Sequence, residues 1–197
     1  MRLVSVNVSL PRLVAGPNGP VETGIFKTAV EGRVMLRKLN LDGDGQADLV
    51  NHGGEHKAVY AYPLEHYAYW ENELGREAMH YGQFGENFTV EGMRERDVCI
   101  GDVFRIGTAS LQVTQPRVPC FKLGIKMGDP AFIKRFLRSR RSGCYLRVLE
   151  EGEVGAGDSI ELVQEEPVRL SVHDVHAVHF PETNAYDVDG IRRALSI

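Results

Sequence analysis

The stretch Val98-Cys-Ile-Gly-Asp-Val-Phe-Arg-Ile106 indicates the kind of fold, because a Gly-Asp turn leads directly into a short strand. The same arrangement returns in Val154-Gly-Ala-Gly-Asp-Ser-Ile-Glu-Leu162. Gly and Asp are favoured in tight turns, since Gly tolerates positive φ and the Asp side chain accepts hydrogen bonds from nearby backbone N–H groups. The repetition predicts a chain that re-enters its sheet twice in the same way, as in a closed antiparallel barrel.

Short β-type stretches recur along the chain, separated by Gly, Pro, Asp and Asn turns. They are Leu3–Val8, Val34–Leu39, Ala58–Ala61, Phe88–Val90, Val103–Ile106, Ser110–Thr114, Tyr145–Val148 and Ser159–Val163. Apolar residues at helical spacing predict two helices, at Pro63–Leu74 and Asp129–Arg141. The predicted fold class is therefore mainly β with α (α+β), an antiparallel β-barrel or Greek-key arrangement with peripheral helices.

The sequence pattern changes in the last part of the chain, after residue 165. Ser171 is placed to cap a helix at Val172–His179, and a second short helix is expected at Gly190–Leu195. We expect residues 1–165 to form the main domain and residues 166–197 a short helical C-terminal extension. Two such helices bury too little surface to fold alone, so they should pack on the main domain.

Length and composition fit one sizeable core with an appendage, in a chain of 197 residues. No apolar run approaches the roughly 18 residues that span a bilayer, and the N-terminus lacks the apolar region of a secretory signal. We expect a cytoplasmic protein without membrane attachment; the oligomeric state is left open. Its cysteines, Cys99, Cys120 and Cys144, form no CxxC motif, which argues against a disulfide framework, a zinc ribbon or an iron–sulfur cluster.

Charge is unevenly distributed. The formal net charge is −4, which points to no nucleic acid partner. The segment from Arg117 to Arg147 nevertheless holds nine Lys or Arg residues and a single acid, Asp129. A locally cationic segment in an acidic protein suits a small anionic ligand. For the residues after Lys126, a solvated basic helix is an equally good interpretation.

Cys120 is the strongest candidate for a reactive residue. It lies in Gln115-Pro-Arg-Val-Pro-Cys-Phe-Lys-Leu123, where two prolines restrict the backbone. Arg117 and Lys122 flank it, and positive neighbours favour the thiolate, which attacks electrophiles and binds soft metals. The alternative is a buried structural cysteine, the commoner role of a lone thiol. The other two cysteines lie among apolar strand residues, and we expect them to be structural.

A second cluster, Asn51-His-Gly-Gly-Glu-His-Lys57, combines paired glycines with hydrogen-bond donors. Gly53 and Gly54 let the backbone approach a ligand and turn successive N–H groups towards an anion, and His52 and Lys57 add side-chain donors. By itself, the pattern also fits a polar hairpin.

Three further patterns are weaker. Phe84-Gly-Glu-Asn87 places a carboxylate and an amide before a strand, where they can equally close a turn. Asp42-Gly-Asp-Gly-Gln-Ala-Asp48 looks like a calcium loop but lacks the Gly at the sixth position and the Glu at the twelfth, so we reject an EF-hand. His173, His176 and His179 fan over about 120° of a helix, so zinc is not expected there.

Taken together, these segments resemble the MOSC domain, the module found at the C-terminus of molybdenum cofactor sulfurases, and most closely its branch of stand-alone YiiM-like proteins. The matching segments are Asp42–Asp48, His52–Gly54, Phe84–Asn87, Val98–Asp102, Gln115–Leu123, Ser142–Tyr145 and Arg147–Glu153. In this combination and order they are specific, and they cover residues 30 to 165.

The resemblance implies a β-barrel-like fold and a cysteine that binds molybdenum, a role that falls on Cys120. It further implies reduction of N-hydroxylated compounds, including hydroxylaminopurine base analogues, with His52 or Asn87 orienting or protonating the leaving oxygen. At family level it also brings an association with pyridoxal phosphate binding. The phosphate of the molybdenum cofactor (molybdopterin) needs backbone N–H groups and fixed cations, and the candidates are Gly53, Gly54, Lys57, Arg117, Lys122 and Arg147.

The chain carries no flavin or iron–sulfur motif, so a separate reductase is expected to supply electrons. The main alternative is a non-catalytic carrier of molybdenum cofactor or sulfur, with Cys120 as a persulfide site. A metal-free thiol enzyme or binding module is a third interpretation. The tail resembles a truncated form of the three-helix extension of the YiiM-like branch.

Overall fold

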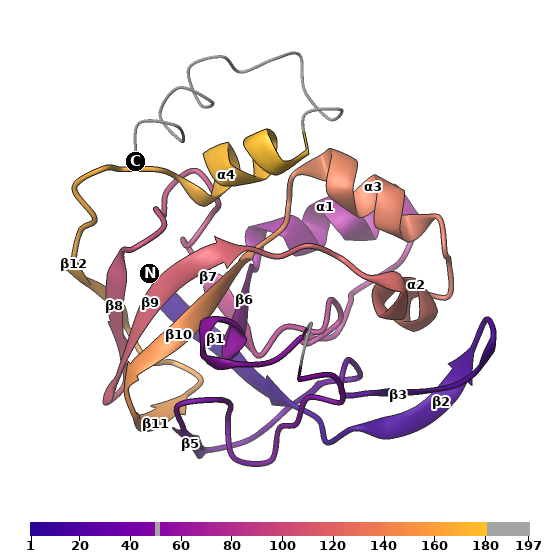
Figure 1. The fold of residues 1–197 in the computed structure, drawn as a ribbon, viewed down its shortest axis with the longest axis horizontal. Helices are drawn as coiled ribbons and strands as arrows, with labels where there is room; N and C mark the ends of the chain where they lie inside the picture. The colour runs from indigo at the N-terminus through magenta and orange to yellow at the C-terminus, as the bar shows by residue number, and fades with distance from the viewer. Residues whose placement is uncertain (50–51, 181–197) are drawn as a thin grey trace.

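The computed structural model describes residues 1–49 and 52–180, and Figure 1 shows their arrangement. The strands are β1 (Arg2–Val8), β2 (Arg12–Gly16), β3 (Gly19–Thr23), β4 (Thr28–Ala29), β5 (Arg33–Leu36), β6 (Val59–Pro63), β7 (Phe88–Glu91), β8 (Val103–Ile106), β9 (Ala109–Pro116), β10 (Cys144–Glu150), β11 (Gly152–Gly155) and β12 (Ile160–Gln164). The helices are the 3₁₀ turn η1 (Glu55–Lys57) and α1 (Glu65–Leu74), α2 (Phe121–Met127), α3 (Phe132–Ser139) and α4 (Val172–His179).

The predicted class, mainly β with peripheral helices, is confirmed. Each predicted strand corresponds to an observed one, although β5 ends at Leu36 instead of Leu39. Both predicted helices also occur. Helix α1 begins at Glu65 because Pro63 still belongs to β6, and α3 is shorter at both ends than the predicted Asp129–Arg141.

The main sheet has eight strands in the order β12-β8-β9-β10-β6-β7-β1-β4. Two details correct the predicted closed antiparallel barrel. The β6–β7 pair is parallel, and the sheet is open, with β12 and β4 at its edges. Near the start of β1, Leu3 forms backbone hydrogen bonds of 2.8 and 2.9 Å with residues 157–158, which lie just before β12. These bonds bring β1 close to the start of β12, so the sheet nearly closes there.

The two Gly-Asp turns have the same local geometry. Gly101 and Gly157 have positive φ values of 96° and 97°, which favour glycine. The carboxylate of Asp102 accepts from Cys99 N–H, and that of Asp158 accepts from Gly155 N–H, both at 2.9 Å. Each turn is thus closed by its own aspartate before the chain enters β8 or β12.

The interior divides into two hydrophobic clusters. One fills the sheet with aliphatic residues and contains Leu3, Val59 and Leu111, each fully buried. The other is largely aromatic, lies between the sheet and α1 to α3, and contains Tyr62, Trp70, Phe84, Phe132 and Phe136. This aromatic cluster fixes the helices that carry or support the site described below.

Helix α2 was not predicted from the sequence. It has seven residues, starts directly after Cys120 and ends at Gly128, whose φ of 70° is left-handed. Gly124 lets α2 approach the start of α3, because an added Cβ would lie 3.2 Å from Pro130 Cα. A helix this short gives little periodic signal, so tertiary packing decides it. The hairpin of β2 and β3, which projects at the lower right of Figure 1, was also missed.

The predicted capping of the tail helix is confirmed, since Ser171 Oγ accepts from Asp174 N–H at 3.0 Å at the start of α4. Backbone hydrogen bonds from Val172 to Val98 (3.0 Å) and from His173 to Glu95 (2.9 Å) hold α4 on the main domain. The second predicted tail helix, Gly190–Leu195, lies outside the described residues. The division at residue 165 stays a prediction. None of the helices in the described part of the chain is long and apolar enough to cross a membrane.

Phe136→Ala is expected to lower the free energy of unfolding by roughly 3–5 kcal/mol, because this 1% exposed ring packs from α3 against Trp70 of α1 and Tyr62 of the sheet. The matched control is Phe121→Ala, the same substitution at a ring that is 49% exposed, which should cost less than about 1 kcal/mol. Urea unfolding followed by circular dichroism measures both. Equal losses would contradict the packing described for α3.

Candidate functional site

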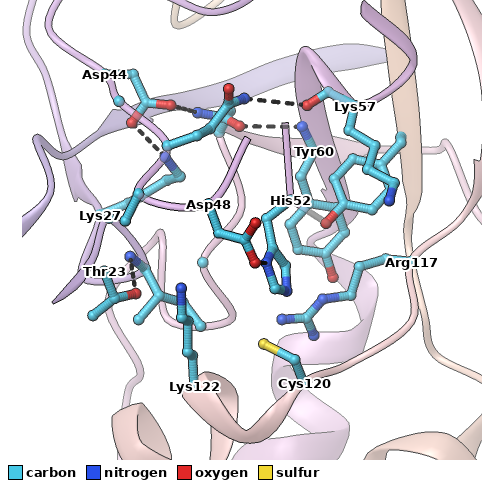
Figure 2. A pocket seen from close by; sticks show the side chains of 18 of the residues that line it. Thr23, Lys27, Asp44, Asp48, His52, Lys57, Tyr60, Arg117, Cys120 and Lys122 are labelled. Atoms are coloured by element: carbon cyan, nitrogen blue, oxygen red, sulfur yellow. Dashed lines mark hydrogen bonds and ion pairs between the residues drawn. The ribbon is translucent and has the colours of Figure 1, made fainter. Parts of the chain in front are cut away.

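A pocket opens between the sheet, the start of α2 and the loops that carry Asp44, Asp48 and His52 (Figure 2). It brings together stretches that are far apart in the sequence, from Thr23 to Tyr145. Of the residues predicted from the sequence, the pocket holds Cys120, His52, Asn87, Lys57, Arg117 and Lys122.

Three predicted residues do not line this pocket. Gly53 and Gly54 line a separate shallow hollow beside His56 and Thr114. Gly54 has a φ of 86° and precedes η1, so its glycine is explained by the turn itself. Arg147 lies on β10, and its Nε donates to Gln112 Oε1 on β9 at 2.7 Å. The structure therefore places Gly53, Gly54 and Arg147 outside the pocket that contains Cys120.

Cys120 is the residue immediately before α2, in an extended conformation (φ −116°, ψ 173°), and its side chain lines the pocket. Burial acts to raise the pKa of the thiol, but the hydrogen bond with His52 and the charge of Arg117 outweigh it and lower the pKa to about 7. By contrast, burial raises the pKa of Cys99 and of Cys144, both shielded from solvent. Of the three thiols, Cys120 alone combines an ionised form near neutral pH with an open pocket.

His52 is held between Cys120 and Asp48. Its Nδ1 lies 3.0 Å from Oδ2 of Asp48, the residue four positions earlier in the chain. The hydrogen bond with the Cys120 side chain raises the pKa of His52, against the effect of partial burial. Figure 2 shows the sulfur, the imidazole and the Arg117 guanidinium converging on one point of the pocket. The arrangement favours a thiolate–imidazolium pair oriented by a carboxylate.

Arg117 supplies a buried positive charge. Its side chain is 5% exposed, and the guanidinium lies 5.1 Å from the ring centroid of Tyr60 and 5.2 Å from that of Phe136. Within the described ranges 1–49 and 52–180, Nη1 is buried and has no hydrogen-bond partner. A buried unpaired donor is costly, so this atom is suited to meet an anion in the pocket.

Asn87 is occupied by structural hydrogen bonds. Its Oδ1 accepts from Tyr60 N–H at 3.1 Å, and its Nδ2 donates to Asp44 Oδ2 at 2.9 Å and to Asn7 O at 3.3 Å. Asp44 in turn forms a buried ion pair with Lys27. This network fixes the pocket wall and leaves Asn87 less free than His52 to act on a ligand.

Sequence reasoning missed Lys27, Asp44, Asp48 and Tyr60 as pocket residues. Asp44 and Asp48 belong to the segment rejected above as a calcium loop, and its resemblance to a family motif was the signal that could have identified them. Lys27 is an isolated lysine in a loop. No local sequence pattern could have identified it as a pocket residue, because its ion-pair partner, Asp44, is 17 residues further along the chain.

The chain matches known proteins over most of its length. The MOSC domain family model matches residues 48–161. An uncharacterised protein of Bacillus subtilis, YflK, is 43% identical over 98% of this chain and 86% of its own length. A protein of Gibberella moniliformis named reductase is 36% identical over 81% of this chain, but this chain spans only 29% of that protein.

Solved structures agree with the fold. The crystal structure of YiiM from Geobacillus stearothermophilus superposes with a TM-score of 0.78 at 35% identity, covering 98% of this chain and 89% of the other. The similarity therefore includes both the sheet and the helices that surround the pocket.

Alkylation of the cofactor-free protein by iodoacetamide should have its pH midpoint near 7 at Cys120, because the thiolate reacts and its fraction rises with pH through the pKa. His52→Ala removes the hydrogen bond that favours the thiolate, so the midpoint should rise towards the ordinary value of 9.0. Peptide mapping by mass spectrometry reports Cys120 separately from the two buried thiols. A wild-type midpoint near 9 would refute the pair.

Proposed function

Because this chain belongs to the MOSC domain family, we propose that it binds a molybdenum cofactor and reduces N-hydroxylated compounds, such as hydroxylaminopurine base analogues. The observation that carries the proposal is the Cys120 thiol, with a pKa of about 7, in a pocket that also contains the unpartnered Nη1 of Arg117. We expect the protein to act in the cytoplasm.

The donor set in the pocket fits such a cofactor. A thiolate is a soft ligand of the kind that molybdenum and other thiophilic metals accept from proteins. Among the described residues, no group of three or more His, Cys, Asp or Glu side chains is arranged to hold a metal ion. A metal bound through Cys120 would therefore take most of its ligands from a second group, as the dithiolene sulfurs of a molybdenum cofactor would supply.

The cations in the pocket suit the anionic part of that cofactor. Arg117 has a free donor, and Lys122 and Lys57 also line the pocket. Charge-assisted hydrogen bonds from such groups are the usual way to hold a phosphate. Gly53, Gly54 and Arg147 are left out of this assignment because they lie outside the pocket. Pyridoxal phosphate, the other family-level association, stays a prediction without support from these contacts.

Reduction of an N–OH group consumes two electrons and two protons and releases an amine and water. When bound, the cofactor supplies two-electron chemistry at a sulfur-ligated metal. His52 can hold a proton on Nε2 at the pocket while Asp48 fixes the ring through Nδ1. Asn87, with its amide already bonded, maintains the wall that faces the substrate.

The reductase name of the Gibberella moniliformis protein supports a reductive role. That protein is much longer than the matching region, so it has room for a source of electrons within one chain. Here we propose that a separate reductase partner supplies them. The alternative, a non-catalytic carrier of cofactor or sulfur, uses the same Cys120 and differs in having no turnover.

Protein produced in a host that synthesises the cofactor should contain molybdenum, and Cys120→Ala should contain little, as measured by elemental analysis. Cys99→Ala is the matched control, because it removes a buried thiol outside the pocket and should keep the metal. Equal molybdenum in all three proteins would refute Cys120 as the ligand.

Turnover separates the enzyme from the carrier. With reduced methyl viologen as electron donor, the wild type should convert an N-hydroxylated purine to the amine, and Cys120→Ala should fall to the rate without enzyme. Bound molybdenum without any reduction of the substrate would favour the carrier.

A further inference from the structure

We propose that the solvent face of α3, which carries the cations Lys134 and Arg138, is the docking site for an acidic one-electron carrier protein. The inference rests on the proposed function, which needs electrons from outside this chain. It assigns a role to the exposed cations of α3, which do not line the pocket.

Helix α3 lies behind the pocket, where it packs against Arg117, which lines the pocket. Its Phe136 is buried, with its ring centroid 5.2 Å from the Arg117 guanidinium carbon. Lys134 and Arg138 are each two positions from Phe136, which places them about 200° around the helix, on the opposite side. Both are exposed. A partner on this face would therefore be separated from the Arg117 guanidinium by the helix, roughly 10 Å thick, and by the further 5.2 Å between the Phe136 ring and that guanidinium.

The contacts at the end of α3 fix this geometry. Arg140 ends the helix in the left-handed conformation (φ 57°), and the next residues return to the pocket. Tyr60 Oη donates to Ser142 O at 2.8 Å, and Gly143 N–H donates to the buried Glu95 at 2.7 Å. In Figure 1, α3 lies next to α2, the helix that begins directly after Cys120. A protein docked on α3 would thus be held in a constant position relative to Cys120.

The charges on this face are available to a partner. Within the part of the chain that the structure describes, Lys134 and Arg138 form no ion pair, whereas Arg135 is neutralised by Asp129. Arg141 continues the positive surface beyond the helix, with its guanidinium 3.6 Å from the ring centroid of Tyr69. In a protein with a net charge of −4, such a face attracts an acidic partner selectively and speeds its association.

A nucleic acid is a poorer occupant of this face. The hollow beside the end of α3 contains the acids Glu65, Glu95 and Asp97 together with four arginines, so it does not offer a phosphate backbone a uniformly positive surface. The chain as a whole is acidic, and a polyanion favours a basic domain. An acidic protein can place its carboxylates on the cations and avoid these acids.

Such a carrier satisfies the electron balance. For each substrate, R–NHOH takes up two electrons and two protons and gives R–NH₂ and water as the N–O bond breaks. Two molecules of a one-electron carrier would each be oxidised once. Electron-carrier complexes are small and transient, which fits a face formed by one short helix.

The test compares Arg138→Glu with Arg105→Glu, which makes the same charge change at an exposed arginine on β8 that has no ion pair with a described residue. The probe is an acidic flavodoxin, and its binding to the cofactor-free protein is measured by titration at low ionic strength. Arg138→Glu should weaken binding by about tenfold, and Arg105→Glu by less than about twofold. Lys134→Glu, placed in the first turn of α3 where Glu is favourable, should behave like Arg138→Glu without loss of folding.

The loaded enzyme provides a second readout. With flavodoxin kept reduced by NADPH and flavodoxin reductase, Arg138→Glu should lose turnover, whereas with reduced methyl viologen it should match the wild type. Absence of turnover with methyl viologen in the wild type would refute the proposed function but leave the binding result intact. Equal flavodoxin binding by the two variants, or binding of a single-stranded oligonucleotide to this face in place of flavodoxin, would overturn the docking proposal.

Discussion

The buried guanidinium of Arg117 is the constraint on which the rest of the site depends. It lies between two aromatic rings, Tyr60 and Phe136, with one donor that no described residue satisfies. A buried cation is stable only if anionic or polar groups lie close to it. The thiolate form of Cys120 is one such group, so the same charge that lowers the thiol pKa is itself stabilised by the sulfur. The pocket is therefore organised for negative charge.

The geometry of Cys120 follows from its position between two regular elements. Strand β9 ends at Pro116, and α2 begins at Phe121, so the connecting loop is short, and it contains a second proline, Pro119. Functional residues placed on a short loop between rigid elements can be held with little freedom. The opposite wall is equally restrained by the Lys27–Asp44–Asn87 network. His52, facing Cys120 and oriented by Asp48, is thus left as the polar side chain best placed to handle protons.

Helices α2 and α3 have different roles around the pocket. Helix α2 presents Cys120 and Lys122 to the cavity, and α3 packs Phe136 behind Arg117 while exposing Lys134 and Arg138. One basic segment therefore serves two surfaces, because helical periodicity separates its apolar and cationic faces. The interpretation as a solvated basic helix describes the exposed cations of α3. The small-anion site stays a prediction for Arg117 and Lys122, which line the pocket.

The amino-acid sequence by itself determined most of the strands but not β2, β3, β4 and β11. It also determined helices α1 and α3, the Ser171 cap and the prominence of Cys120, because alternation, capping and proline-braced loops act over a few residues. It also carried the resemblance to the MOSC family through motifs in a fixed order. Only the tertiary structure decided that the sheet stays open, that α2 forms, and that Lys27 pairs with Asp44 while Arg147 lies away from the pocket. These outcomes depend on contacts between distant segments, for which local sequence patterns contain no physical signal.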